Sequence, residues 1–246
     1  MLTARRSLWL ERLFRLYNRN LLRRRFEGLR VAGLRHLRER AADVPLVLYA
    51  NHSSWWDGLV IFEVGMSCAL KQYAMMEERQ LRVYGFFRRL GAFSVVREDG
   101  RGARRSIDYA AGLLSERAQG DAATPALWIF PQGDTRANDL RPLNLYRGAA
   151  HIALRLPRVR LLPVALRYEH GNAFRPEIFV RIGAPEKFGE HEKMGAKNLT
   201  ARMEQRLTQT LDCVRADIIE EEFADYEELV APERRRKEGR RASNLV

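Results

Sequence analysis

Short apolar segments rich in β-branched and aromatic residues alternate along this chain with longer segments of helical periodicity. Such alternation predicts a single α/β domain, for which the chain of 246 residues is long enough. Strands are expected at residues 44–50, 70–74, 92–96, 125–130, 161–166 and 177–182, with a short edge strand and turn within 28–38. Helices are expected at 5–26, 58–68, 77–90 and 103–118, in a segment that ends near 156, and in a long region at 199–229.

One polar stretch, Asn51 to Gly58, follows directly on the expected strand 44–50. It contains His52 and, five residues later, Asp57. If a helix begins one or two residues after the histidine, its first turns bring the carboxylate back beside the imidazole ring. A carboxylate on one ring nitrogen raises the basicity of the other, which can then take a proton from a hydroxyl. The stretch predicts a general base; the alternative is a helix-capping histidine and a solvent-facing aspartate.

Composition limits the classes of partner. The chain carries 43 Lys and Arg against 31 Asp and Glu, a formal net charge of +12, which favours lipid headgroups, phosphorylated substrates or nucleic acid. No nucleic-acid-binding motif accompanies the charge, so we do not expect nucleic acid as a partner. Cys68 and Cys213 form neither a metal-ligand spacing nor a disulfide framework, which favours a reducing compartment. We expect no bound metal and no bound cofactor.

The N-terminal segment 5–26 places apolar and aromatic side chains at helical spacing among many arginines. Trp9, Leu13, Leu16 and Tyr17 form the stripe. Such a basic amphipathic helix suits a membrane interface, on which it lies without crossing it. An equally good interpretation is a helix packed on the domain with a solvated basic face. Because the sequence contains neither a membrane span nor the apolar core of a secretory signal, we expect a peripheral protein on the cytoplasmic face of an anionic membrane.

Two further strands end at residues suited to anion binding. The expected strand 92–96 runs into Arg97, and the strand 125–130 opens into the loop Pro131-Gln-Gly-Asp-Thr-Arg136. Loop amides and guanidinium groups together can hold an anionic group. Taken alone, the arginine is more readily a surface residue paired with neighbouring acids, and the loop only a turn.

In this order the stretches resemble the glycerolipid acyltransferase family, of the lysophosphatidate acyltransferase type. Asn51, His52 and Asp57 match that family's Asn-His-x4-Asp block. Its second block, a strand ending in arginine, is similar to Gly91-Ala-Phe-Ser-Val-Val-Arg97, and its third, Phe-Pro-Glu-Gly-Thr-Arg, is similar to Phe130-Pro-Gln-Gly-Asp-Thr-Arg136. The first block gains its specificity from the blocks that follow it.

A fourth block, a strand centred on Pro163-Val164, and the pair Arg147-Gly148 at a helix start extend the resemblance over roughly residues 28–185. The resemblance implies a mixed, mostly parallel sheet flanked by helices. It also implies transfer of a fatty acyl group from acyl-CoA or acyl carrier protein to a hydroxyl of a lysophospholipid or related lipid. His52 would be the general base and Asp57 its orienting carboxylate. Acceptor binding would fall to Arg97, Gln132, Gly133, Thr135, Arg136 and Arg147.

The third block departs from the family pattern, since Gln132 stands for glutamate and Asp134 is inserted before Thr135. An extra carboxylate that faced the site would repel a phosphate dianion. The acceptor therefore stays open between a lysophospholipid, a glycolipid and an amino-acid lipid. An inactive lipid-binding relative is the alternative from another class.

The expected organisation has three parts. Residues 1–27 form the basic helix, a candidate membrane anchor; residues 28–230 form the acyltransferase domain; and residues 231–246 form a basic, apolar-poor, disordered tail. Trp55 and Trp56 suit either the entry of the acyl chain or the core, and we expect one of them in the core.

Overall fold

The structure is a computed structural model that describes residues 1–39, 44–97, 99–116, 123–189 and 192–233. Its strands are β1 (Leu29–Ala32), β2 (Leu46–Ala50), β3 (Lys71–Glu77), β4 (Ala92–Val95), β5 (Pro125–Ile129), β6 (Arg158–Glu169), β7 (Glu177–Ile182), β8 (Glu186–Gly189) and β9 (Tyr226–Val230). Its helices are α1 (Leu8–Arg25), α2 (Arg35–Arg38), α3 (Asp57–Ser67), α4 (Glu78–Val83), the 3-10 helix η1 (Gly85–Leu90), α5 (Gly100–Ser115), α6 (Gly148–Ala153) and α7 (Ala196–Ile219).

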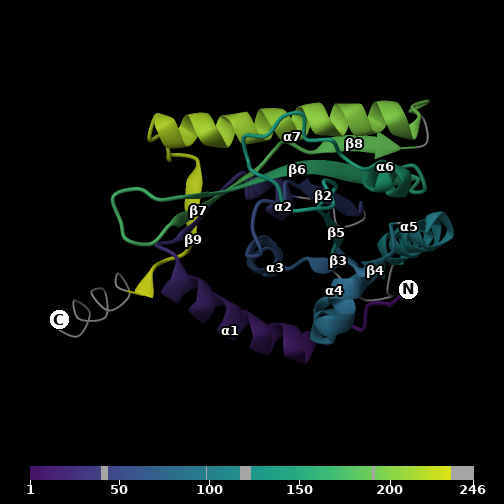
Figure 1. Ribbon diagram of the computed structural model, residues 1–246, viewed down its shortest axis with the longest axis horizontal. Helices are drawn as coiled ribbons and strands as arrows, with labels where there is room; N and C mark the ends of the chain where they lie inside the picture. The colour runs from purple at the N-terminus through teal and green to yellow at the C-terminus, as the bar shows by residue number, and fades with distance from the viewer. Residues whose placement is uncertain (40–43, 98, 117–122, 190–191, 234–246) are drawn as a thin grey trace.

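All these strands join one sheet in the order β4-β3-β5-β2-β6-β7-β1-β9, with β8 paired to β6 beside that path. The neighbours from β4 through β6 run parallel, and β7 and β9 bring in antiparallel pairs. The prediction of a single α/β domain with a mixed, mostly parallel sheet is therefore confirmed. Helices cover both faces of the sheet, and α7 lies along one of them (Figure 1).

The central strand β2 shows why the sheet is covered on both sides. Its five residues are all buried. Val47 and Tyr49 belong to the apolar cluster beneath α5, α6 and α7, whereas Leu46 and Leu48 belong to the cluster beneath α1, α2 and α3. Successive side chains of a strand point to opposite faces, so a strand under helices on both faces has to be apolar throughout.

Two of the expected helices were wrong in extent. The expected helix 77–90 is instead the end of β3, α4 and η1, because the backbone at Tyr84 leaves helical geometry. The long helical region 199–229 ends at Ile219, the last residue of α7. Glu221 then adopts a positive φ of 56°, and the acidic segment after it turns into β9.

The strand β9 pairs antiparallel with β1. The strand within 28–38 was predicted to lie at the edge, but it lies between β7 and β9. The acidic segment is a strand because it pairs with β1 near the other end of the chain, and not because of its local propensity. Of the expected tail at 231–246, residues 234–246 lie outside the described residues.

The helix α1 lies on the domain with its polar side inward. Asn18 is fully buried and donates from Nδ2 to the carbonyl of Leu59 at 3.0 Å. Arg15 and Arg19 each place Nε 3.3 Å from Oε1 of the buried Glu63 on α3. The helix is packed on the domain, as one of the two interpretations predicted, but the side that meets the domain is largely polar rather than apolar.

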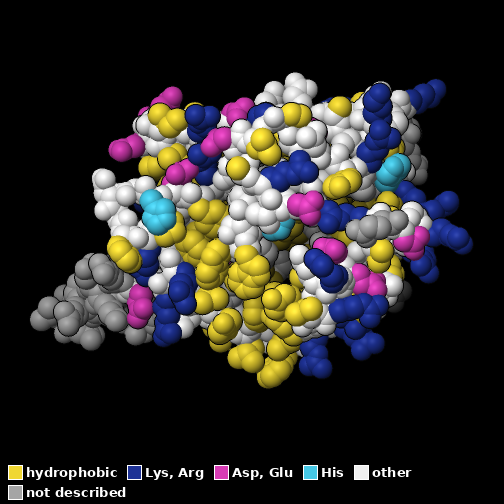
Figure 2. All heavy atoms as spheres, in the orientation of Figure 1, with side chains coloured by type: hydrophobic (Ala, Val, Ile, Leu, Met, Phe, Trp, Pro, Cys, Tyr) yellow, Lys and Arg dark blue, Asp and Glu magenta, His cyan; other side chains and the backbone are white. Residues whose placement is uncertain are grey.

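The opposite side of α1 exposes apolar side chains. Trp9 is 71% exposed and Leu16 is 70% exposed, and neighbouring residues of α4 and η1, Val83 and Phe86, are exposed beside them. Figure 2 shows hydrophobic side chains gathered over the part of the surface where α1 and α4 lie. Within the described part of the chain, none of the helices has the length and apolar character that a membrane crossing requires.

Candidate active site

His52 and Asp57 lie at the carboxyl end of β2, where the central parallel strands stop. Nδ1 of His52 lies 2.8 Å from Oδ2 of Asp57. The carboxylate is fully buried, whereas the imidazole is 25% exposed. Because ligands of open α/β sheets bind beyond the carboxyl ends of the strands, this edge is where a reaction site is expected.

The local geometry of this contact differs from the one predicted. The helix was expected to begin near Ser53, but α3 begins at Asp57 itself. The preceding turn folds so that the backbone N–H groups of Ser53 and Ser54 donate to Asp57 Oδ2 at 2.7 and 2.9 Å. The carboxylate therefore reaches the imidazole from the first residue of α3, and its position is set by the turn rather than by helical periodicity.

Tyr168 on β6 completes the surroundings of the buried carboxylate. Its hydroxyl donates to Oδ1 of Asp57 at 2.6 Å. Burial, and then the charge of Asp57, raise the pKa of Tyr168 above its ordinary value, so the phenol stays protonated and remains a donor. With donors on both oxygens, the buried carboxylate of Asp57 is fully engaged, as burial of a charged group requires.

The loop after β5 holds the backbone of His52 from both sides. The N–H of His52 donates to Oε1 of Gln132 at 2.8 Å, and its carbonyl accepts from the N–H of Arg136 at 2.8 Å. The ring of Phe130 stacks on the imidazole with centroids 4.6 Å apart. These contacts join the first and third sequence blocks and leave the ring few orientations.

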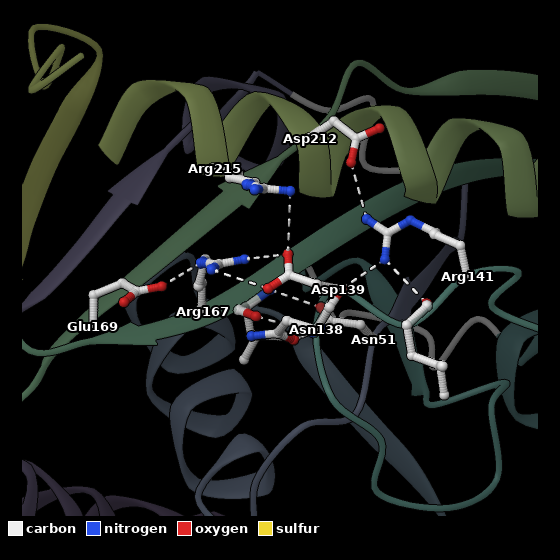
Figure 3. Close-up of polar contacts among 10 residues, drawn as sticks. Asn51, Asn138, Asp139, Arg141, Arg167, Glu169, Asp212 and Arg215 are labelled. Carbon is white, nitrogen blue, oxygen red and sulfur yellow. Dashed lines mark hydrogen bonds and ion pairs between the residues drawn. The ribbon is translucent and has the colours of Figure 1, made fainter. Parts of the chain in front are cut away.

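Asn51 ties the end of β2 to β6. Its Oδ1 accepts from the N–H of Leu166 at 2.7 Å, and its Nδ2 donates to the carbonyl of Leu166 at 2.9 Å and to Asn138 at 2.8 Å. The asparagine of the first block is thus a buried backbone clamp, and through Asn138 it also reaches the loop after β5 (Figure 3).

The far part of the same loop is fastened by ion pairs. Arg167 on β6 donates to Asp139 at 3.0 Å, and Arg141 donates to Asp212 on α7 at 2.9 Å (Figure 3). Arg167 also lowers the pKa of Asp139, which favours the charged form of that carboxylate. The loop that carries the third block is therefore anchored to two elements at once.

The imidazole of His52 faces a cavity of about 700 Å³. Its wall is mostly apolar and comes from α1, α3, β3, η1 and β5, with Phe14, Phe62, Met75, Phe87 and Trp128 among its residues. The volume falls within the roughly 300–1,000 Å³ typical of ligand pockets. Trp55 lines this cavity and is exposed, whereas Trp56 packs against the core beside Phe26, as predicted for one member of the pair.

The residues predicted to bind the acceptor divide into two groups. Arg97, Gly133, Thr135 and Arg147 line the cavity. Gln132 and Arg136, which hold the backbone of His52, are absent from its wall.

Arg97 sits close against the glycine of the third block. Gly133 adopts a φ of +77°, and a Cβ built there would lie 2.1 Å from Nη1 of Arg97. Tyr146 packs on the guanidinium, with its ring centre 5.6 Å from Cζ. Nη2 lies 3.4 Å from Asp134 and 3.9 Å from Glu77. The inserted aspartate therefore points to Arg97.

The comparison with known families agrees with this arrangement. The sequence pattern of a protein family described as Acyltransferase matches residues 28–167, which contain His52 and Asp57. The chain belongs to this acyltransferase family. The resemblance seen in the sequence blocks is thereby confirmed.

One curated relative of this acyltransferase-family chain is a lyso-ornithine lipid O-acyltransferase of Brucella abortus (strain 2308). It is 31% identical over 181 residues, which are 69% of this chain and 62% of the relative. The chain thus matches less than two thirds of the length of that protein.

Sequence reasoning missed Tyr168 and Glu77. Tyr168 lies 111 residues after Asp57 and two residues beyond the expected strand 161–166, and Glu77 was assigned to a helix. Only the pairing of β6 beside β2, and of β3 beside β5, brings them to the site. Among the described residues, no cluster of three or more His, Cys, Asp or Glu is arranged to hold a metal ion.

Proposed function

We propose that this protein is a membrane-surface O-acyltransferase. It would move a fatty acyl group from acyl-CoA or acyl carrier protein to a hydroxyl of a lipid acceptor. The observation that carries the proposal is the 2.8 Å contact between His52 Nδ1 and Asp57 Oδ2 at the wall of a mostly apolar cavity, in a chain of the acyltransferase family.

The contact assigns a role to each ring nitrogen. A carboxylate accepts hydrogen bonds, so Nδ1 of His52 carries the proton and Nε2 is the basic nitrogen. Nε2 takes the proton of the acceptor hydroxyl as its oxygen attacks the thioester carbonyl. The new C–O bond forms, the C–S bond breaks, and the imidazolium returns the proton to the leaving thiolate. Asp57 orients the ring and stabilises its positive charge.

The cavity supplies the place for the acyl chain. Its apolar wall removes hydrocarbon from water, which favours a fatty acyl group by about 25 cal/mol per Å² of apolar surface buried. Holding the thioester and the hydroxyl together accounts for a large part of the rate of such a reaction, because a thioester is already activated. Positioning and proton transfer are therefore the two tasks that the protein performs.

The exposed side of α1 supports binding to a membrane surface. Trp9, Leu13, Leu16 and Tyr17 are exposed together, and Arg5, Arg12, Arg24 and Arg25 are exposed on the same segment. Apolar side chains enter the interface and arginines attract anionic headgroups. Phe14 of the same helix lines the cavity, so the binding surface adjoins the site that would receive a lipid.

Two acceptor classes are considered for this reaction, and the name of the relative bears on one of them. The relative from Brucella abortus is named for lyso-ornithine lipid, an amino-acid lipid. A lysophospholipid is the alternative that the wider family suggests. Both present a free hydroxyl near a long acyl chain, and the same His52 chemistry serves either.

The test is product analysis by mass spectrometry. The full chain is incubated with labelled acyl-CoA or acyl carrier protein and a total lipid extract, in parallel with His52→Ala and with His170→Ala, a matched change at an exposed loop histidine. A labelled lipid formed by the intact chain and by His170→Ala, but not by folded His52→Ala, supports the proposal. Absence of product with both donors favours an inactive lipid-binding protein.

A further inference from the structure

We propose that Arg97 and Glu77 form a receptor for a zwitterionic amino-acid headgroup, in which Arg97 binds the carboxylate of the acceptor and Glu77 binds its ammonium group. The inference rests on the proposed function and names the acceptor class of the same site. It is carried by three observations: a guanidinium with one unbonded buried nitrogen, a carboxylate that caps no helix and forms only a long ion pair with that guanidinium among the described residues, and the balance of charge around them.

The guanidinium of Arg97 is held in place without being fully bonded. Tyr146 and Gly133 pack against it, and Nη1 is buried without a hydrogen-bond partner among the residues that the structure describes. A buried donor without an acceptor destabilises the state in which it occurs. A carboxylate is the usual partner of a guanidinium, and a ligand carboxylate would offer Arg97 acceptor oxygens beyond those of the fold.

Glu77 and its neighbour Glu78 differ in how their carboxylates are bonded within the fold. Glu78 accepts hydrogen bonds from Ser94 and Arg82. Glu77 precedes α4 as its N-cap but forms no side-chain cap hydrogen bond. It is one of the residues that line the cavity, and its carboxylate lies 3.9 Å from Nη2 of Arg97. Arg97 meets this carboxylate only at the outer limit of an ion pair, so an ammonium group of the acceptor would be a closer partner for it.

The sum of charges around Arg97 disfavours a phosphate dianion. Asp134 approaches Nη2 from the loop at 3.4 Å, so one guanidinium faces two carboxylates. Arg147 adds one positive charge to the same cavity wall. A phosphate dianion would be attracted by Arg97 and Arg147 but repelled by Glu77 and Asp134. A headgroup with one carboxylate and one ammonium satisfies Arg97 and Glu77 together.

The test compares acceptors that differ by one charged group. The full chain is assayed with three acceptors in mixed micelles. N-(3-hydroxyacyl)ornithine has a carboxylate and an ammonium group, N-(3-hydroxyacyl)norvaline lacks the ammonium group, and lysophosphatidate carries a phosphate instead. We expect kcat/KM for the ornithine compound to exceed the other two at least tenfold. Glu77→Gln should lower kcat/KM tenfold with the ornithine compound and much less with the norvaline compound, and circular dichroism checks that the variant is folded.

Two further variants complete the design. Arg97→Gln should lower kcat/KM for both amino-acid acceptors, because both carry the carboxylate. The control is Glu227→Gln, the same substitution at a residue of β9 that forms an exposed ion pair with Arg38. It should leave kcat/KM for both amino-acid acceptors unchanged. Equal effects of Glu77→Gln on both amino-acid acceptors, or a preference of the unaltered chain for lysophosphatidate, would overturn the inference and leave the proposed function standing. Absence of turnover with all three acceptors would overturn the inference, and absence of product in the lipid-extract assay as well would overturn the proposed function.

Discussion

The hydroxyl of Tyr168 donates a 2.6 Å hydrogen bond to the carboxylate of Asp57, on the oxygen opposite the one that contacts His52. The tyrosine lies on β6 and the aspartate opens α3, so the sheet itself supplies part of the surroundings of the proposed base. The role of Tyr168 is to hold Asp57 in position, since its hydroxyl bonds to the carboxylate rather than to the imidazole.

Replacing Tyr168 by phenylalanine should weaken both the fold and the reaction. The variant removes a hydrogen bond to a charged, buried group, a loss of about 1.5–3 kcal/mol. We expect kcat to fall about tenfold with little change in KM, because Tyr168 is not among the residues that line the cavity. Urea unfolding and steady-state kinetics measure the two effects.

A matched variant separates the two effects. Tyr226→Phe removes a similar hydrogen bond, from the Tyr226 hydroxyl to Asp217 at 2.7 Å, on the β9 side of the domain. It should lower the free energy of unfolding and leave kcat unchanged. If both tyrosine variants lost the same share of kcat, the loss would reflect general destabilisation, and the positioning role of Tyr168 would be wrong.

Replacing Gly133 by alanine should displace Arg97. The added Cβ would lie 2.1 Å from Nη1, and the φ of +77° is strained for alanine by about 1–2 kcal/mol. We expect the KM for the lipid acceptor to rise several-fold. Gly112→Ala, where a Cβ on α5 meets nothing within 4 Å, should instead raise the free energy of unfolding by up to about 1 kcal/mol. An unchanged KM in Gly133→Ala would contradict the contact with Arg97.

The stability contributed by Glu78 should depend on pH. Hydrogen bonds from Ser94 and Arg82 lower the pKa of Glu78 from 4.5 to about 2. A carboxylate with a depressed folded-state pKa stabilises the fold above its unfolded pKa and loses that contribution as the pH falls through the folded value. The deficit of Glu78→Gln should therefore be full at pH 7 and shrink steadily below pH 4.5, as followed by urea unfolding. A deficit of constant size across this range would show that the carboxylate charge is not its source.

The exposed side of α1 should govern membrane binding without affecting the fold. Trp9→Ser combined with Leu16→Ser should weaken binding to anionic vesicles at least tenfold, because burying one such side chain contributes about 1.5–3 kcal/mol. Vesicle co-sedimentation gives the affinity, and circular dichroism checks the fold. Ile219→Ser, at a residue 69% exposed on α7 across the sheet, serves as the control (Figure 1). Equal binding by the double variant and the control would show that α1 is not part of the membrane-binding surface.

The sequence was sufficient for the parts of the structure that local patterns specify. Continuous apolar runs such as β2 identified the buried strands, and His52 and Arg97, predicted as site residues just after strands, both line the cavity. Parallel strands bring their carboxyl ends to one edge of the sheet, which is why residues distant in sequence lie near one another there. The family resemblance added the expected chemistry.

The remainder depends on contacts that no local pattern encodes. The segment of β9 is rich in glutamate and reads as helix, yet it becomes a strand because β1 offers an unpaired edge. Glu63 and Asn18 turn the polar side of α1 toward the domain, although composition alone suggests the reverse. Tyr168 reaches Asp57 only through strand pairing. Each miss involves partners far apart in the chain.

The contact between Gln132 and the backbone of His52 changes how a difference in the motif should be weighed. The position that the wider family fills with glutamate here supplies an uncharged oxygen to a peptide N–H. An amide and a carboxylate can both offer that oxygen, so the substitution keeps the acceptor while removing a negative charge. By sequence identity alone, the third block of this chain looks altered at position 132. By the atom that position 132 presents to the backbone of His52, it is equivalent to the family pattern.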